Sequence, residues 1–213
     1  MSPGQIFVVD DHPLTRKGLC EAIRAEPDLE VCGEAAGYEE ALRSLRAKPT
    51  EVLVLDLNLK DGSGWTLLQQ LQTEKHLPPT LVLSVCDEEV YAPRLIEAGA
   101  RGYLMKDEPI AAVLAAIRKI LAGHVAVSDK IASRLIQPSG KSSAQALDDL
   151  SDRELQVYEM LCQRLGNKDI AARLGISHKT IGTYKARLME KLGVRTTPEL
   201  LARAQGGAPN TGP

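Results

Sequence analysis

The sequence lacks paired cysteines, paired histidines and long apolar stretches. Its four cysteines are scattered and none lies at CxxC spacing, so neither a zinc site nor a disulfide framework is indicated. No basic segment followed by a long apolar run occurs at the N-terminus, and no run approaches the length of a membrane span. We therefore expect a cytoplasmic protein with no membrane partner. The four histidines are equally dispersed, and we assign none of them a catalytic role.

Charge is distributed unevenly along the chain. With 213 residues, 44% of them hydrophobic, the chain is long enough for two small domains with separate cores. The net charge of −2 combines 13 basic and 19 acidic residues before Gly123 with 13 basic and 9 acidic residues after it. From Arg164 onward, nine basic residues face three acidic ones. A basic segment suits an anionic partner such as double-stranded DNA, although a solvated helical face has the same composition.

Residues 6–122 alternate short apolar runs with amphipathic stretches of helical period. Near-continuous Val/Leu runs such as Val52–Leu55 are typical of strands buried on both faces of a parallel sheet, with helices packed on either side. The predicted strands are IFVV, EVCGEA, VLVLD, TLVLS and RGYLM. The sequence therefore predicts an α/β domain over residues 1–122.

The pattern changes after Gly123. We expect a linker over residues 123–149, with a short helix near Ser128–Ile136 and then the flexible stretch PSGKSSAQ. Residues 150–206 are expected to form four helices, and 207–213 a disordered tail. The expected boundary signals of these helices are a capping box of Ser151 with Glu154, a staple of Leu150 on Leu155, Asn167 and Asp169, Gly175, Ser177, and Thr197-Pro198.

Polar residues end four of the five apolar runs, at the sheet edge where open parallel sheets bind ligands. They are Asp10, Asp11, Asp56, Ser84 and Lys106. Three close carboxylates repel one another unless a cation neutralises them, and oxygen ligands without His or Cys favour Mg²⁺. With the metal and Lys106 screening negative charge, Asp56 is the expected nucleophile toward a phosphoryl group, because this transfer needs mainly positioning and charge neutralisation.

Each of these residues has an ordinary alternative when taken alone. Ser84 and Lys106 would then be a strand residue and a surface charge. Two adjacent acids directly after a buried strand are harder to dismiss, since their burial is costly without a counter-charge. The functional interpretation therefore depends on the placement of all these residues together at one edge of the sheet.

With these strand ends, the first 122 residues resemble the receiver domains of two-component response regulators. The resemblance implies a doubly wound, flavodoxin-like parallel sheet of five strands in the order 2-1-3-4-5. It implies that Asp56 accepts a phosphoryl group from a sensor histidine kinase. Asp11, Asp56 and the backbone carbonyl of Asn58 would bind Mg²⁺, and Asp10 would act through water.

The same resemblance implies that Lys106 holds the phosphate, and that Ser84 and Tyr103 are the switch hydroxyl and the switch aromatic. Three positions depart from the usual receiver pattern: Asp107 follows the lysine where proline is common, Val85 replaces a small residue, and Lys60 replaces proline. We hypothesise that Asp56 therefore gains and loses phosphate at an atypical rate.

The segment Asn167–Val194 has apolar positions that pack one helix across another through a glycine-containing turn, which predicts a helix-turn-helix. Residues 150–204 resemble the LuxR-type DNA-binding domain, so the whole chain resembles a NarL/FixJ-type response regulator. That resemblance implies a homodimer on phosphorylation. The candidate DNA contacts are Lys168, Lys179, Thr180, Thr183, Tyr184, Lys185, Arg187 and Lys191.

Gly182 stands where lysine is usual in that family, and Tyr184 where histidine is common. Glycine costs a helix about 1 kcal/mol relative to alanine. Because it also has no side chain, we expect fewer direct contacts to the bases. Phosphate contacts would then supply mostly sequence-independent, salt-dependent affinity. The alternative that these residues form a basic helical module that binds protein remains open.

Two enzymatic alternatives are disfavoured. A phosphatase of the haloacid-dehalogenase type would need a second acid two residues after the nucleophile, and Asn58 stands there. A nucleotide-binding domain would place GxGxxG after the first strand, and the sequence lacks it. We expect no enzyme beyond a phosphoacceptor with slow self-dephosphorylation.

Overall fold

The computed structural model describes residues 2–59, 61–136 and 150–204. Two compact units are present: the described residues up to Ser84 with Ala92–Ala132, and Val85–Tyr91 with the described residues from Ser133 onward. The expected linker stretch PSGKSSAQ, the expected tail and Lys60 lie outside the described residues. Among the described helices, none combines the length and the apolar character that crossing a membrane requires.

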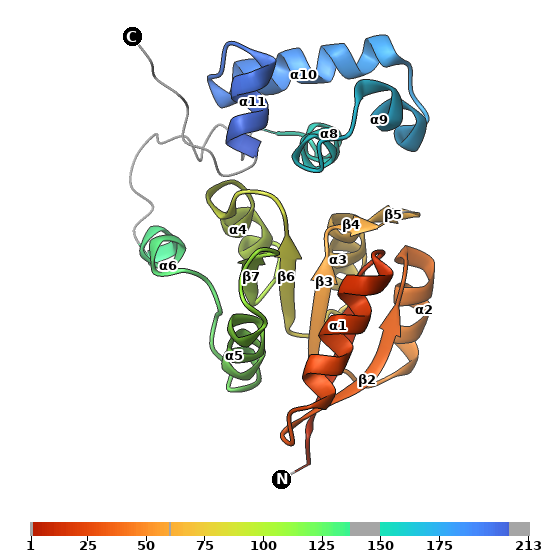
Figure 1. Cartoon of the computed structure of the whole chain (residues 1–213), viewed down its shortest axis with the longest axis vertical. Helices are drawn as coiled ribbons and strands as arrows, with labels where there is room; N and C mark the ends of the chain where they lie inside the picture. Colours follow the sequence, from red (N-terminus) through yellow and green to blue (C-terminus); the bar gives the residue numbers. More distant parts are fainter. Residues whose placement is uncertain (1, 60, 137–149, 205–213) are drawn as a thin grey trace. The chain divides into compact units, whose positions relative to one another are not determined.

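The first unit is built on a five-stranded parallel sheet (Figure 1). Its strands are β1 (Gly4–Val9), β2 (Leu29–Ala35), β3 (Val52–Asp56), β6 (Thr80–Ser84) and β7 (Gly102–Met105). They lie in the order β2-β1-β3-β6-β7 and every neighbouring pair is parallel. Counting these five strands alone, the predicted order 2-1-3-4-5 is confirmed.

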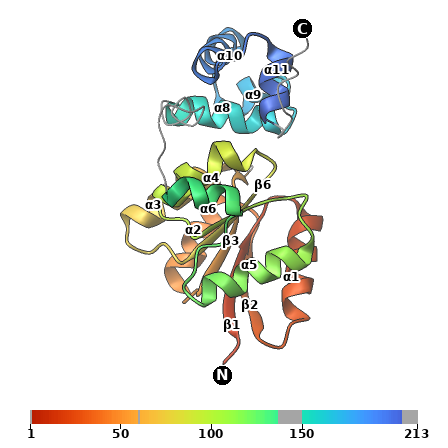
Figure 2. The ribbon, with the colours of Figure 1, turned by 90° about the vertical axis from the view of Figure 1, so that its left-hand side faces the viewer.

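Helices cover both faces of this sheet. They are α1 (Pro13–Arg24), α2 (Tyr38–Ala47), α3 (Gly64–Thr73) and α5 (Ile110–Leu121), whereas α4 (Glu88–Glu97) begins in the second unit and ends in the first. In Figure 2, α1 and α5 lie on one face, and α2 and α3 on the other. Alternate strand residues such as Ile6, Val8 and Val54 pack with Ile23 and Ile117 on the α1/α5 face. Every residue of β3 and β6 is buried, as the Val/Leu runs predicted.

A two-stranded hairpin follows β3 and was not predicted as strands. It pairs β4 (Asn58–Leu59) with β5 (Gly62–Ser63) in antiparallel fashion. The chain then passes so close to β3 that a Cβ on Gly64 would lie 2.3 Å from the carbonyl oxygen of Asp56. Only glycine allows this approach, which leads the chain directly into α3.

The second unit contains a helical domain with α8 (Asp152–Cys162), α9 (Asn167–Leu174), α10 (His178–Leu192) and α11 (Thr197–Ala204). The predicted capping box is confirmed, because Ser151 and Glu154 exchange side-chain and backbone hydrogen bonds at the start of α8. Gly175 ends α9 in the left-handed conformation at φ 63°, and Ser177 caps α10. The expected short helix is α6 (Asp129–Ile136).

Helix α10 packs against α8, α9 and α11. Its apolar positions Ile181, Leu188 and Leu192 are buried, and so is Ile170 of α9. The α9-turn-α10 pair is therefore the helix-turn-helix that the glycine-containing turn predicted.

Candidate functional site

Three buried carboxylates meet at the carboxyl edge of the sheet. Asp10 and Asp11 follow β1 and Asp56 ends β3, and their exposed fractions are 1%, 4% and 1%. We call these three residues the acid cluster. The ammonium of Lys106, just after β7, lies 2.9 Å from Oδ2 of Asp10 and 2.7 Å from Oδ2 of Asp56. The sheet thus brings together residues up to 96 positions apart in the chain.

Hydrogen bonds from the backbone orient the acid cluster. The amide of Asn58, the first residue of β4, donates to Oδ1 of Asp56 over 3.1 Å. The amide of His12 donates to Oδ1 of Asp10 over 2.7 Å, and Arg16 of α1 donates to the Asp10 carbonyl over 2.6 Å. With Lys106 on its other oxygen, the Asp56 carboxylate is held at both oxygens and cannot rotate freely.

Burial sets the electrostatics of this site. Loss of solvent, with the nearby charge of Asp10, raises the pKa of Asp56 to about 6, although Lys106 opposes the rise. Burial also lowers the pKa of Lys106, but Asp56 and Asp10 outweigh it and the net pKa is raised. One ammonium therefore faces three acids, so the ionised site carries uncompensated negative charge.

This donor set fits a divalent cation. Oδ1 of Asp11 is buried and makes no hydrogen bond in the described part of the chain, although Nδ1 of His12 approaches it to 2.6 Å. Three buried carboxylates close together repel one another, and their burial is costly unless a cation binds. The residues present therefore suit the metal that the sequence predicted at this edge.

The two predicted switch residues lie on the neighbouring strands. Ser84 is buried at the end of β6, and its carbonyl accepts a hydrogen bond from the Lys106 amide over 2.8 Å. Tyr103 pairs with Val82 across β7 and β6, and its side chain is fully buried. The structure places both on the strands that flank the lysine. Val85, which replaces the small residue usual after this serine, is 37% exposed.

His12 belongs to this site, and the sequence interpretation missed it. One ligand atom each from Asp10, Asp11, His12 and Asp56 lies within 4.8 Å of the others. The four histidines are far apart in the sequence, so their spacing from one another gives no sign of a site. The informative signal was that His12 directly follows two acids that end a buried strand.

Asp61, in the turn of the β4–β5 hairpin, is a second missed residue. Its carboxylate accepts hydrogen bonds from the backbone amides of Tyr38 (2.7 Å) and Glu39 (3.4 Å) at the start of α2. A Cβ on Gly37 would lie only 2.4 Å from this carboxylate, so glycine makes the contact possible. Asp61 therefore anchors the hairpin that carries Asn58, and the Asp61-Gly62 turn dipeptide was its signal.

In the second unit, the candidate DNA contacts lie mainly on the exposed side of α10. Lys179, Thr183 and Arg187 are exposed and follow one another at intervals of four, so they line one face of the helix. Lys168 of α9 is also exposed, and Tyr184 is half-buried. These positions suit phosphates and groove edges.

Four of the candidates make side-chain contacts within the protein, and one of these is a 3.4 Å hydrogen bond from the Thr183 hydroxyl to the Lys179 carbonyl. Thr180 bonds the hydroxyl of Ser177 (2.7 Å), and Lys185 donates to the side chain of Asn167 (3.3 Å). Lys191 forms an ion pair of 2.7 Å with the buried carboxylate of Glu154. Lys191 therefore has a structural role in this domain, whatever it adds to DNA affinity.

Gly182 lies on the exposed side of α10. No atom lies within 4 Å of the Cβ that a larger residue would have there. The packing of the domain thus does not require glycine at this position, so glycine affects the outer surface and the stability of the helix but not the core.

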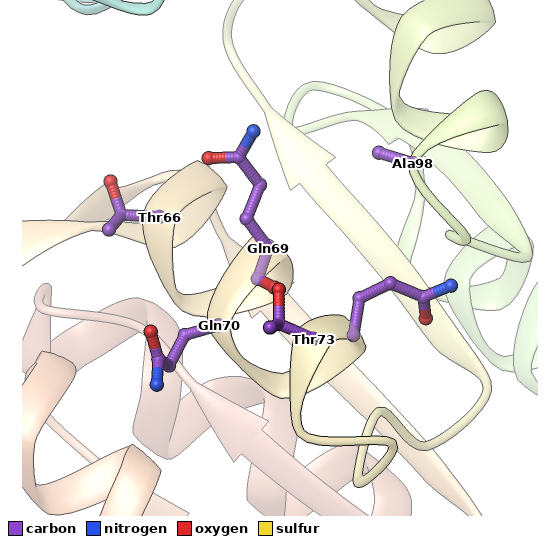
Figure 3. A pocket seen from close by; sticks show the side chains of 6 residues that line it. Thr66, Gln69, Gln70, Thr73 and Ala98 are labelled. Carbon is purple, nitrogen blue, oxygen red and sulfur yellow. The ribbon is translucent and has the colours of Figure 1, made fainter.

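A shallow depression of about 430 Å³ lies elsewhere on the first unit (Figure 3). Amide and hydroxyl side chains of α3 line it together with Ala98. None of the predicted site residues contributes to it, and its open form differs from an enclosed ligand pocket.

Comparison with known proteins finds two family matches, one in each half of the chain. Residues 6–118 match the family model of the response regulator receiver domain, and residues 148–204 match that of bacterial regulatory proteins of the luxR family. The transcriptional regulatory protein UhpA of Escherichia coli is 37% identical over 202 residues, which cover 95% of this chain and 98% of UhpA.

Solved structures agree in fold. The response regulator ChrA of a heme-sensing two-component system is 30% identical, with a TM-score of 0.52, and the match covers 97% of this chain and 98% of ChrA. RcsB of Salmonella enterica serovar Typhimurium, solved bound to promoter rprA with phosphomimetic BeF3−, has a TM-score of 0.67 at 24% identity, with coverage of 95% and 98%.

Proposed function

Because this chain belongs to the response regulators of the NarL/FixJ type, transcription regulators with a receiver domain and a LuxR-type DNA-binding domain, we propose that phosphorylation of Asp56 controls its binding to double-stranded DNA. The carrying observation is the Asp56 carboxylate, held by the Asn58 amide and by Lys106 inside a buried cluster of acids. We further propose that the protein acts in the cytoplasm.

The phosphoryl donor is a phosphohistidine of a sensor histidine kinase. An oxygen of Asp56 attacks phosphorus, the P–N bond breaks, and an acyl phosphate forms on Asp56. Lys106, already 2.7 Å from Oδ2, stays beside the new phosphate and offsets its charge. Asp10 and Asp11 are also buried at this site.

The acid cluster and the Asn58 carbonyl would hold Mg²⁺, which neutralises the charge that builds up on the transferring group. Asn58, two residues after Asp56, offers no carboxyl group to act as a general base for hydrolysis. Self-dephosphorylation is accordingly slow, and the protein is a phosphoacceptor, not a turnover enzyme.

Phosphorylation shifts a conformational equilibrium. Ser84 ends β6, which pairs with β3, and Tyr103 lies in β7, which pairs with β6. A rearrangement at Asp56 is therefore transmitted to both residues through paired strands. The phosphorylated form is a homodimer, which presents two copies of α10 to two half-sites of DNA. RcsB, bound to promoter DNA with a phosphomimetic, is a precedent.

The test is a mobility-shift assay on genomic DNA fragments with wild type and Asp56→Asn, each with and without acetyl phosphate and Mg²⁺. We expect the donor with magnesium to tighten binding of wild type only. Equal binding by both proteins under all conditions would refute the coupling. Absence of selective DNA binding throughout would favour the second candidate, a receiver-controlled output that binds protein, which the bare surface at Gly182 supports.

A further inference from the structure

We propose that Asp61 is a positioning residue for phosphoryl transfer to Asp56, and that it acts through the β4–β5 hairpin, which carries Asn58. The inference rests on the proposed function, because phosphorylation of Asp56 is the step whose rate Asp61 sets. It goes beyond that function by linking the rate to a contact at the start of α2, made by a residue outside the acid cluster.

The first argument is that the hairpin is too short to hold its own position. Each of its strands has two residues, and the pairs are Asn58 with Ser63 and Leu59 with Gly62. A two-stranded hairpin alone is marginally stable at best in water. The position of this hairpin therefore depends on its contacts with the rest of the first unit.

The second argument is that Asp61 supplies such a contact at the turn. The side chain of Leu59 is buried and holds the hairpin near its base. At the turn, the Asp61 carboxylate accepts hydrogen bonds from the amides of Tyr38 (2.7 Å) and Glu39 (3.4 Å). The first amides of a helix have no partner within the helix, and the helix dipole favours a negative charge beside them. The turn is thus fixed to α2.

The third argument is that glycine leaves room for this contact on both sides. A Cβ on Gly37 would lie 2.4 Å from Oδ1 of Asp61, and a Cβ on Gly62 would lie 2.8 Å from Cβ of Tyr38. Gly37 has an extended backbone with φ −163°, a conformation that any residue adopts. The absence of a side chain at Gly37 therefore serves the approach of Asp61.

The fourth argument is what the hairpin does for the phosphoacceptor. The Asn58 amide donates to Oδ1 of Asp56 over 3.1 Å, while Lys106 holds Oδ2. Without the amide, the carboxylate is held at one oxygen only and can turn. Attack on phosphorus requires a well-aimed oxygen, so a small displacement lowers the rate. Asp61 thus affects the transfer without touching the reacting atoms.

The experiment measures the rate at which acetyl phosphate with Mg²⁺ phosphorylates the full chain, followed by intact-protein mass spectrometry. An oxygen of Asp56 attacks phosphorus, the bond from phosphorus to the acetate oxygen breaks, and acetate leaves. The variants are Asp61→Ala and Asp61→Asn, because asparagine keeps an acceptor oxygen that suits a helix N-terminus. Glu40→Ala is the matched control, since this exposed carboxylate also accepts from a backbone amide beside α2, that of Ala36 over 2.9 Å, but lies outside the hairpin.

A second measurement reports the hairpin without phosphorylation. It is amide hydrogen exchange at Asn58, followed by NMR in EDTA. Gly37→Ala tests the same contact from the other side, because the three atoms nearest to its Cβ all belong to the Asp61 carboxylate, which must move away. Added to Asp61→Ala, the Gly37→Ala change should have no further effect.

We expect Asp61→Ala and Gly37→Ala to slow phosphorylation by roughly tenfold and to speed exchange at Asn58 by at least about fivefold. Asp61→Asn and Glu40→Ala should stay within about twofold of wild type.

Two results would overturn the proposal alone. Equal losses in Asp61→Ala and Glu40→Ala would mean that the Asp61 contact only stabilises α2. Unchanged exchange at Asn58 in Asp61→Ala would mean that buried Leu59 holds the hairpin by itself. A wild type that accepts no phosphate, even though exchange at Asn58 responds as expected, would refute the proposed function and the rate role of Asp61 with it.

Discussion

The acid cluster and the exposed face of α10 differ in how firmly each functional side chain is held. Asp56 is buried, bonded at both oxygens and paired with a lysine 50 residues away in the chain. Lys179 and Arg187 of α10 project from a helix surface. A phosphorylation site needs a preorganised, water-poor environment, whereas side chains that meet phosphates act through charge and tolerate motion. The stability of the first site is therefore more sensitive to single substitutions.

The largest expected effect follows from removing the counter-charge of the acid cluster. Lys106→Ala leaves buried carboxylates without their cation and should lower the free energy of unfolding of the first unit by about 3 kcal/mol. Divalent cations should restore part of this loss. Urea unfolding with EDTA or Mg²⁺ measures it, with exposed Lys119→Ala as control. Equal stability of the two variants would mean that the cluster needs no counter-charge.

The second effect is a dependence on pH. Because the pKa of Asp56 is raised to about 6 in the folded protein, the folded state binds more protons than the unfolded state between about pH 4 and 6. The free energy of unfolding therefore falls as pH rises through this window, by up to about 3 kcal/mol. Asp56→Asn should lack this component, and thermal melts in EDTA from pH 4 to 7.5 compare the two. Parallel curves would contradict the raised pKa.

The third effect concerns the one buried ion pair described for the helical domain. Lys191 and the Ser151 amide hold the pKa of Glu154 below its usual range despite its burial. The ion pair therefore stabilises the domain fully at pH values above the ordinary glutamate pKa. This stabilisation is lost as the pH falls through the pKa of Glu154 in the folded protein. Glu154→Gln should cost the second unit about 1–3 kcal/mol at neutral pH, as urea unfolding would show.

Lys191→Met separates structure from DNA binding at the same ion pair. It should destabilise the domain similarly, yet change the salt dependence of DNA affinity less than Lys179→Ala does, since Lys191 is already paired with Glu154. Fluorescence anisotropy on one DNA fragment at several salt concentrations measures the slopes. If Lys191→Met changed the salt slope more than Lys179→Ala does, Lys191 would be a phosphate contact.

The smallest effect comes from filling the bare position on α10. Gly182→Lys should stabilise the helix by about 1 kcal/mol and steepen the salt dependence of DNA binding by about one phosphate contact. Gly182→Ala isolates the helix contribution, because both side chains enter open space. Identical salt slopes for the two variants would place position 182 away from DNA.

The sequence by itself determined the features that depend on local periodicity. Apolar runs predicted the five strands, because burial on both faces demands continuous Val and Leu. The cap at Ser151 and the break at Gly175 marked helix ends, because these signals act within a few residues. The acids and the lysine of the site were also recognisable, since every one of them lies at the end of a strand or directly after it.

Only the tertiary structure decided which distant groups share a contact. Asp61 caps a helix 23 residues earlier, and Lys191 pairs with Glu154 across two packed helices. Each of these side chains is an ordinary polar residue in the sequence. Helix packing and the connections between strands determine which residue each of them contacts. These contacts join residues far apart in the chain, so a local sequence pattern does not predict them.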